Sequence, residues 1–121
     1  MGRRRAMGEL EGDVLALLWA SEAPLTPGEV LERLDAGIAY TTAMTILTRL
    51  WQKGLVERES RGRAYAYRPL VTEAELAAQR MQATLERTRD REGALSRFVS
   101  SLSKKDERAL RSIVDELDRT S

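Results

Sequence analysis

The chain has 121 residues, 42% of them hydrophobic, which fits one domain or two small ones with a modest core. It contains no cysteine and no histidine, which excludes disulfides, thiol nucleophiles and the commonest transition-metal ligands and general bases. Twenty lysines and arginines nearly balance 19 acidic residues, for a net charge of +1.

Because no apolar run approaches the roughly 20 residues of a membrane span and no signal-peptide pattern is present, we expect a cytoplasmic protein. No cluster of catalytic groups stands out, so we expect neither an enzyme nor a cofactor or metal.

The charges are distributed unevenly along the chain. Residues 9–39 carry seven acidic residues and one basic residue, a net charge of −6, whereas residues 40–70 carry six basic and two acidic residues, a net charge of +4. Three arginines, Arg3, Arg4 and Arg5, form a basic N-terminal arm. Such segregation is typical of a nucleic-acid-binding face on a nearly neutral protein. Ordinary surface charge, with the arm as a disordered tail, is the alternative.

The first two helices are marked by apolar spacing and by a start signal. Leu10, Val14, Leu17 and Leu18 recur at helical spacing and predict a helix over about residues 9–20. Residues 21–25 form a predicted turn. The run Thr26-Pro27-Gly28-Glu29 is a capping box with proline at the first helical position, and the helix that follows is expected to end near Gly37.

A third helix is predicted over about residues 41–53, with Gly54 ending it. A helical projection divides it into two faces. The apolar face, expected to join the core, holds Ala43, Met44, Ile46, Leu47, Leu50 and Trp51. The other face holds Thr41, Thr42, Thr45, Thr48, Arg49, Gln52 and Lys53. We expect both tryptophans, Trp19 and Trp51, to serve the core rather than to stack on bases.

Two short strands follow, over residues 55–59 and 64–68, joined by a turn around Gly62 and with Tyr65 and Tyr67 on one face. The rest of the chain is predicted to be helical. A second capping box at residues 72–75 starts a helix with an alanine-rich stripe that fades near Gly93, and Ser103 resembles a further cap. Two apolar stripes mark the remaining helices: Leu95, Phe98, Val99 and Leu102, then Leu110, Ile113, Val114 and Leu117.

This order of elements predicts a mainly α fold with a small β-hairpin, a winged helix-turn-helix domain followed by a helical region. The predicted organisation is a basic arm over residues 1–8, a DNA-binding domain over 9–70 and a helical dimerization region over 71–121. The third helix would enter the major groove, where threonine and arginine can contact base edges, while hairpin arginines reach phosphate. The candidate DNA contacts are Thr41, Thr42, Thr45, Arg49, Lys53, Arg61 and Arg63. A merely solvated polar face is the alternative.

The C-terminal stripes require a partner surface. Three helices of about 45 residues in total cannot form a substantial core alone, so they pack on the N-terminal half, on a second copy, or on both. A symmetric homodimer is the expected arrangement, because two-fold symmetry in the protein matches a palindromic site in DNA. The candidate dimerization residues are the eight apolar residues of the two stripes.

Four stretches resemble a known family: residues 10–19 (LEGDVLALLW), 39–50 (AYTTAMTILTRL), 53–56 (KGLV) and 64–67 (AYAY). The chain resembles the penicillinase-repressor family, which includes beta-lactamase, methicillin-resistance and copper-responsive repressors. The resemblance implies a homodimer held by C-terminal helices, and a pseudo-palindromic operator often built on TACA and TGTA half-sites. It assigns DNA contacts to Thr41, Thr42, Thr45 and Arg49. Met44 stands where some members carry arginine.

The resemblance also bears on induction. Some members are cleaved in the dimerization region in response to a membrane sensor protease, and the bond involved maps onto Arg97–Phe98. Those members have asparagine before the phenylalanine, where this chain has Arg97. The copper-responsive members use C-terminal cysteine pairs, so the absence of cysteine excludes that chemistry here.

Three other readings of the same residues remain. One is a winged-helix regulator of another family that responds to a small-molecule ligand, although no polar cluster in the tail marks a pocket. A second is a winged-helix protein-interaction module that never contacts DNA. A hydrolase is the weakest reading, for want of a catalytic group.

Overall fold

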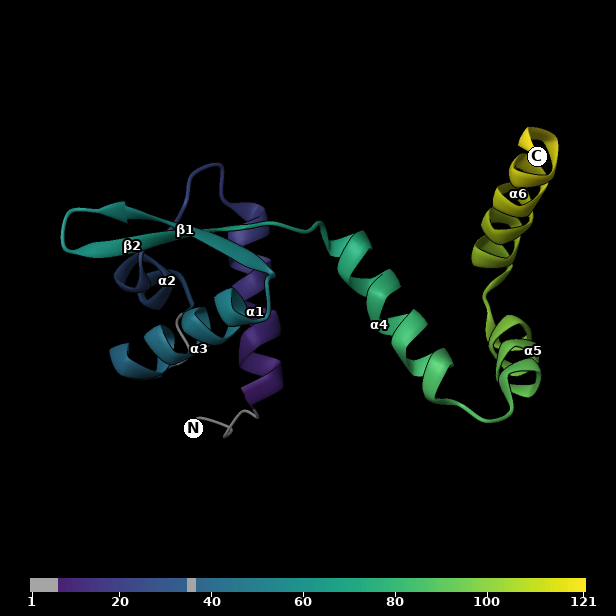
Figure 1. Ribbon diagram of the computed structural model, residues 1–121, viewed down its shortest axis with the longest axis horizontal. Helices are drawn as coiled ribbons and strands as arrows, with labels where there is room; N and C mark the ends of the chain where they lie inside the picture. Colours follow the sequence, from purple (N-terminus) through teal and green to yellow (C-terminus); the bar gives the residue numbers. More distant parts are fainter. Residues whose placement is uncertain (1–6, 35–36) are drawn as a thin grey trace. The chain divides into compact units, whose positions relative to one another are not determined.

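A computed structural model describes residues 7–34 and 37–121 (Figure 1). The predicted arm at Arg3, Arg4 and Arg5 lies outside the described residues. The elements are α1 (Met7–Ala20), α2 (Pro27–Leu34), α3 (Tyr40–Gln52), β1 (Val56–Arg61), β2 (Ala64–Pro69), α4 (Glu73–Arg87), α5 (Arg91–Ser101) and α6 (Lys104–Thr120). The predicted fold class, mainly helical with one small hairpin, is confirmed. The chain divides into two compact units, Met1–Ala77 and Ala78–Ser121, which are described separately below.

Side chains cap the helices where the sequence predicts it. At the start of α2, the Thr26 N–H donates to Glu29 Oε1 at 2.9 Å and the Glu29 N–H donates to Thr26 Oγ1 at 3.3 Å. Thr72 and Glu75 form the same reciprocal pair before α4, both at 3.0 Å. The Ser103 hydroxyl accepts from the backbone N–H of Asp106 at the start of α6. Each cap satisfies N–H groups that the first helical turn leaves without a partner.

The helix boundary predicted near Gly93 is wrong. Helix α4 ends at Arg87, and α5 begins at Arg91 with Asp90 as its N-cap, whose carboxylate accepts from the Gly93 N–H at 3.0 Å. Gly93 therefore lies in the first turn of α5 and not at the C-terminal end of α4. A Cβ built there would lie 2.1 Å from Asp90 Oδ2, so the glycine leaves room for the cap. Helix α2 ends at Leu34, before the expected end near Gly37, and residues 35 and 36 lie outside the described part.

The hairpin is longer than predicted and gains a third extended segment. Its antiparallel register runs from Val56 opposite Pro69 to Arg61 opposite Ala64, which leaves a two-residue turn. Gly62 opens that turn at φ +63°, as tight hairpin turns require. Leu25, predicted as part of a turn, bridges to Tyr67 through two backbone hydrogen bonds of 2.9 and 2.8 Å. This bridge attaches the chain before α2 to the hairpin.

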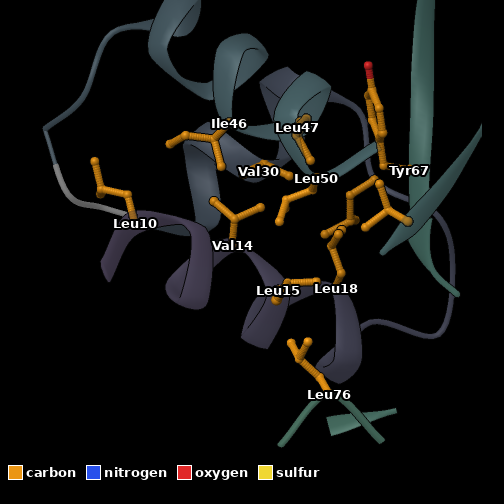
Figure 2. Packing of buried hydrophobic residues seen from close by; sticks show 12 residues of the cluster. Leu10, Val14, Leu15, Leu18, Val30, Ile46, Leu47, Leu50, Tyr67 and Leu76 are labelled. Carbon is orange, nitrogen blue, oxygen red and sulfur yellow. The ribbon is translucent and has the colours of Figure 1, made fainter. Parts of the chain in front are cut away.

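The core of the first unit lies where α1, α2, α3 and the hairpin meet. Figure 2 shows side chains from these elements converging, with Leu76 from the start of α4 beside the α1 residues. The buried cluster comprises Leu10, Val14, Leu15, Leu18, Leu25, Val30, Ile46, Leu47, Leu50, Val56, Tyr67 and Leu76. Burial of this apolar surface fixes α3 by one face, while its opposite face stays on the surface.

Two residues that the projection assigned to the core are on the surface. Met44 is 44% exposed and Trp51 is 41% exposed. Both lie at the margin of the apolar arc, and Ala43, Ile46, Leu47 and Leu50 already fill the space against the core. The prediction for Trp19 is confirmed: it is partly buried against the cluster, and its Nε1–H donates to the Val71 carbonyl at 2.9 Å.

The second unit contains helices without buried side chains. None of the described residues of α5 and α6 is buried in a single chain. The predicted stripes are half-exposed, with Phe98 46% and Ile113 58% accessible to solvent. Apolar residues of α4 and α5 line a groove of about 600 Å³ that includes Met81, Leu85 and Leu95. Within the described residues, no helix combines the length and apolar character that crossing a membrane requires.

Candidate nucleic-acid interface

The exposed face of α3 forms a shallow groove of about 440 Å³. The residues that line it are Thr41, Met44, Thr45, Thr48, Arg49 and Gln52. Five of the six are polar, and all six are spaced to lie on one side of a helix. The structure thus brings together three of the predicted contacts, Thr41, Thr45 and Arg49, and places Thr42 half-buried beside them.

A hydrogen bond within α3 prepares Thr45 as an acceptor. The Thr45 hydroxyl donates to the Thr41 carbonyl at 2.9 Å, so its proton is directed into the helix. The oxygen lone pairs remain free to accept from an external donor. The first turn has no side-chain cap, because Ala39 stands at the N-cap position. The backbone N–H groups of Thr42 and Ala43 donate to the Ala39 carbonyl, at 3.0 and 3.1 Å.

Arg49 supplies the positive charge of this face. It is exposed in the last turn of α3. In the part of the chain that the structure describes, its guanidinium makes no ion pair or hydrogen bond, so its donors are available to a ligand. A planar guanidinium presents paired donors that match two acceptors at once, on a guanine edge or on a phosphate.

Lys53 is placed differently from the other predicted contacts. Its Nζ lies 2.8 Å from Oε1 and 3.0 Å from Oε2 of Glu11, a residue of α1 whose side chain is only 11% exposed. This ion pair attaches the C-terminal end of α3 to α1. An ammonium has three N–H donors, and two are directed to Glu11, which leaves one for another acceptor.

The two arginines of the hairpin turn also differ from one another. Arg61 Nη1 lies 3.4 Å from Glu29 Oε1 in the capping box of α2. Hydrogen bonds from Thr26, with a smaller contribution from Arg61, hold the pKa of Glu29 below its ordinary value. The carboxylate is therefore ionised at neutral pH. Arg63, by contrast, is exposed and has no ion-pair partner within the described residues.

One residue of this surface was not predicted from sequence. The guanidinium carbon of Arg58, in β1, lies 3.7 Å from the ring centroid of Trp51 and 4.1 Å from that of Tyr65. The three side chains come from α3, β1 and β2. From sequence, Arg58 is only one of the six basic residues of the segment 40–70, because no local pattern indicates which rings a strand arginine will contact.

Comparison with known proteins identifies the family. The penicillinase repressor profile matches residues 7–116, from the start of α1 into α6. The chain belongs to the penicillinase repressor family. The resemblance found in the sequence is thereby confirmed.

Two relatives of this penicillinase repressor family member are informative. The transcriptional regulator BlaI of Mycobacterium tuberculosis, in two strains, is 37% identical over 123 residues that cover 98% of this chain and 89% of BlaI. The solution structure of the DNA-binding domain of the repressor BlaI is 25% identical, with a TM-score of 0.51. It covers 62% of this chain and 93% of that domain. The similarity to the domain supports the winged-helix assignment of the N-terminal part.

Proposed function

We propose that this penicillinase repressor family member is a DNA-binding transcriptional repressor that acts as a homodimer on a pseudo-palindromic operator. The observation that carries the proposal is the exposed polar face of α3, whose opposite face is fixed in the core. Two similarities support it: the 37% identity to a transcriptional regulator and the likeness to the DNA-binding domain of a repressor.

In this proposal α3 lies in the major groove. Thr41, Thr42 and Thr45 contact base edges, where a hydroxyl can accept from amino groups and a methyl can pack on thymine methyls. Arg49 makes a bidentate contact to guanine or holds phosphate. Because α3 is anchored by four buried side chains, these groups are presented with little loss of conformational freedom on binding.

The hairpin and the end of α3 contact the DNA backbone. Arg61 and Arg63 flank Gly62 at the tip, where both side chains are exposed and within reach of phosphate. Lys53 contributes through the donor that Glu11 leaves uncommitted. Such contacts fix the position of the protein on the duplex without reading its sequence.

The helical region from residue 71 to 121 provides the dimer interface. Exposed apolar stripes on α5 and α6 are unusual on a monomeric surface, and burying them against a second copy is favourable. The residues concerned are Leu95, Phe98, Val99, Leu102, Leu110, Ile113, Val114 and Leu117. A two-fold dimer would present two α3 helices to two half-sites.

Two finer proposals follow from the family likeness. The protein acts in the cytoplasm, and a membrane sensor protease system relieves repression through cleavage between Arg97 and Phe98. Both residues are exposed in α5, a helix of 11 residues with no buried side chain. In a single chain such a helix unfolds locally at low cost, and a protease cleaves a helical bond only once it is unfolded. In the dimer proposed above, Phe98 would be covered until the two protomers separate.

The test is a binding titration of the full chain. A duplex carrying TACA and TGTA half-sites is compared with a scrambled duplex of equal length and composition. We expect tighter binding to the half-site duplex and salt-dependent binding to both. Equal affinity for the two duplexes would exclude operator recognition of this type. Absence of salt-dependent binding to either would exclude the DNA-binding function.

A further inference from the structure

Arg58 contacts two aromatic rings at the junction of α3 and the hairpin. Trp51 comes from the last turn of α3, and Tyr65 comes from β2. The guanidinium carbon lies 3.7 Å from one ring centroid and 4.1 Å from the other. Both distances are well within the range of cation–π interaction. Both rings therefore contact the Arg58 guanidinium, whose N–H donors make no hydrogen bond within the described residues.

The surroundings of Arg58 differ from those of the other strand arginines. Arg68 forms an ion pair with Glu57, and Arg61 lies beside Glu29. Among the described residues, the Arg58 guanidinium has neither an ion-pair partner nor a hydrogen-bond acceptor. A guanidinium that contacts two rings and has no internal acceptor is oriented in advance but leaves its hydrogen-bonding capacity unused.

The two rings are also placed on the surface rather than in the core. Trp51 is 41% exposed and Tyr65 is 46% exposed. Trp51 follows Thr48 by three residues, so the two are neighbours on the same side of α3. Thr48 lines the groove that is proposed to face DNA. Arg58 thus lies at the margin of that face, on the side toward the hairpin.

We propose that Arg58, in contact with Trp51 and Tyr65, is a further DNA contact that binds a backbone phosphate between the contacts of α3 and those of the hairpin tip. The inference rests on the proposed function. Phosphate is the fitting ligand because its oxygens accept two coplanar N–H donors at once. Trp51 and Tyr65 act as positioning residues that hold the guanidinium ready for this contact, which reduces the entropy lost on binding.

The decisive measurement is the dependence of affinity on salt concentration. Each phosphate contact contributes about 0.9 to the slope of log affinity against log salt. Arg58→Gln should therefore lower the slope by about 0.9 per protomer, or about 1.8 for a dimer, on half-site and scrambled duplexes alike. The matched control is Arg68→Gln, which removes the same charge from the other strand of the hairpin, where Glu57 already neutralises it. We expect the control to leave the slope nearly unchanged.

The positioning role is tested by removing the rings. Trp51→Leu and Tyr65→Leu should weaken binding in the wild-type background but have little further effect in the Arg58→Gln background, because the guanidinium they hold is then absent. Arg58→Lys keeps the charge but loses the planar pair of donors, so its affinity should also fall while the slope stays close to wild type. Circular dichroism verifies the fold of each variant.

Several outcomes would overturn the inference. Equal slopes for wild type and Arg58→Gln would show that Arg58 contacts no phosphate, and equal losses for Arg58→Gln and Arg68→Gln would assign the effect to net charge. Wild-type affinity in Arg58→Lys would show that the planar guanidinium is not needed. If Trp51→Leu or Tyr65→Leu still weakened binding in the Arg58→Gln background, the two rings would not act by positioning Arg58. Wild-type protein that binds no DNA would overturn the proposed function together with this inference.

Discussion

Lys53 Nζ contacts both carboxylate oxygens of Glu11, at 2.8 and 3.0 Å, across 42 residues of sequence. The pair joins α1 to the C-terminal end of α3 and so sets where the candidate recognition helix ends relative to the core. Glu11 is the buried partner, while the lysine side chain is 55% exposed. Removal of the lysine therefore leaves a largely buried carboxylate without its counter-ion, which is more harmful than removal of both groups.

The first prediction concerns this pair. Lys53→Met should lower the free energy of unfolding by about 1–2 kcal/mol, and adding Glu11→Gln should recover part of the loss. Urea denaturation followed by tryptophan fluorescence measures it, because both tryptophans lie in the first unit. Lys105→Met is the control, since Lys105 is exposed and makes no ion pair within the described residues. A double variant no more stable than Lys53→Met would argue against the pair.

The second prediction concerns base reading by Arg49. Arg49→Ala should cost about 1–3 kcal/mol of binding free energy on the cognate duplex and relax discrimination at one base-pair position. Electrophoretic titration against duplexes varied at single positions measures both effects. The control is Arg108→Ala, on α6. Uniform weakening on all duplexes would indicate a phosphate contact instead, and unaltered affinity would show that α3 does not approach DNA at this residue.

The third prediction concerns the hairpin tip. Replacing Arg61 and Arg63 together by alanine should lower the slope of log affinity against log salt by at most about 3–4 per dimer, with little change in sequence preference. Because Arg61 already lies near Glu29, Arg63→Ala alone should account for the larger part. Salt titrations of the single and double variants on one duplex separate the two arginines. Equal slopes of log affinity against log salt for wild type and all variants would mean that the hairpin tip does not contact DNA.

The elements that sequence alone predicts are those encoded by neighbouring residues. The capping boxes at Thr26 and Thr72 and the central core positions of α3 depend on contacts within one or two turns, and they are found as expected, whereas Met44 and Trp51 at the margin of that face are not buried. The pairing of Leu25 with Tyr67 joins residues 42 positions apart, so no local pattern announces it.

The same reason explains what was missed at the candidate interface. Lys53 lies on the polar side of α3 in projection, but its partner is on another helix. The residues around Arg58 form an ordinary strand sequence. Arg58 contacts the two rings only when α3 and both strands come together in the fold. Trp51 was assigned to the core because hydrophobicity was taken as burial, whereas its ring serves a cation at the surface.

The fourth prediction is a pH dependence. Hydrogen bonds from Thr26 and Thr72 lower the pKa of Glu29 and Glu75 from the ordinary value of 4.5. A carboxyl whose pKa is lower in the folded state stabilises the fold above its unfolded pKa, and this contribution is lost as the pH falls through the folded value. Acidification below pH 4.5 should therefore weaken the starts of α2 and α4.

The test uses Glu29→Gln and Glu75→Gln, because glutamine can still cap a helix but does not ionise. The combined variant should lose less stability than wild type when urea unfolding is compared between about pH 7 and about pH 3. Glu22→Gln removes one exposed carboxylate outside any capping box and serves as the control. Equal acid sensitivity of the combined variant and wild type would contradict the prediction.

The fifth prediction concerns dimerization through α6. Ile113 and Leu117 are about 60% exposed in a single chain, at 58% and 62%, so a charged substitution there should leave the helix itself intact. If the stripe packs on a second copy, Ile113→Glu places a carboxylate in an apolar interface and should convert most of the dimer to monomer, because an unpaired buried charge costs several kcal/mol. Ser112→Glu, one residue away on the polar side of α6, adds the same charge and should leave the dimer unchanged. Sedimentation velocity at several concentrations distinguishes the two species.

DNA affinity of the Ile113→Glu monomer should fall steeply on a duplex with two half-sites but little on a duplex with one, because only the former uses both protomers. A dimer that survives both substitutions would place the interface elsewhere in the chain.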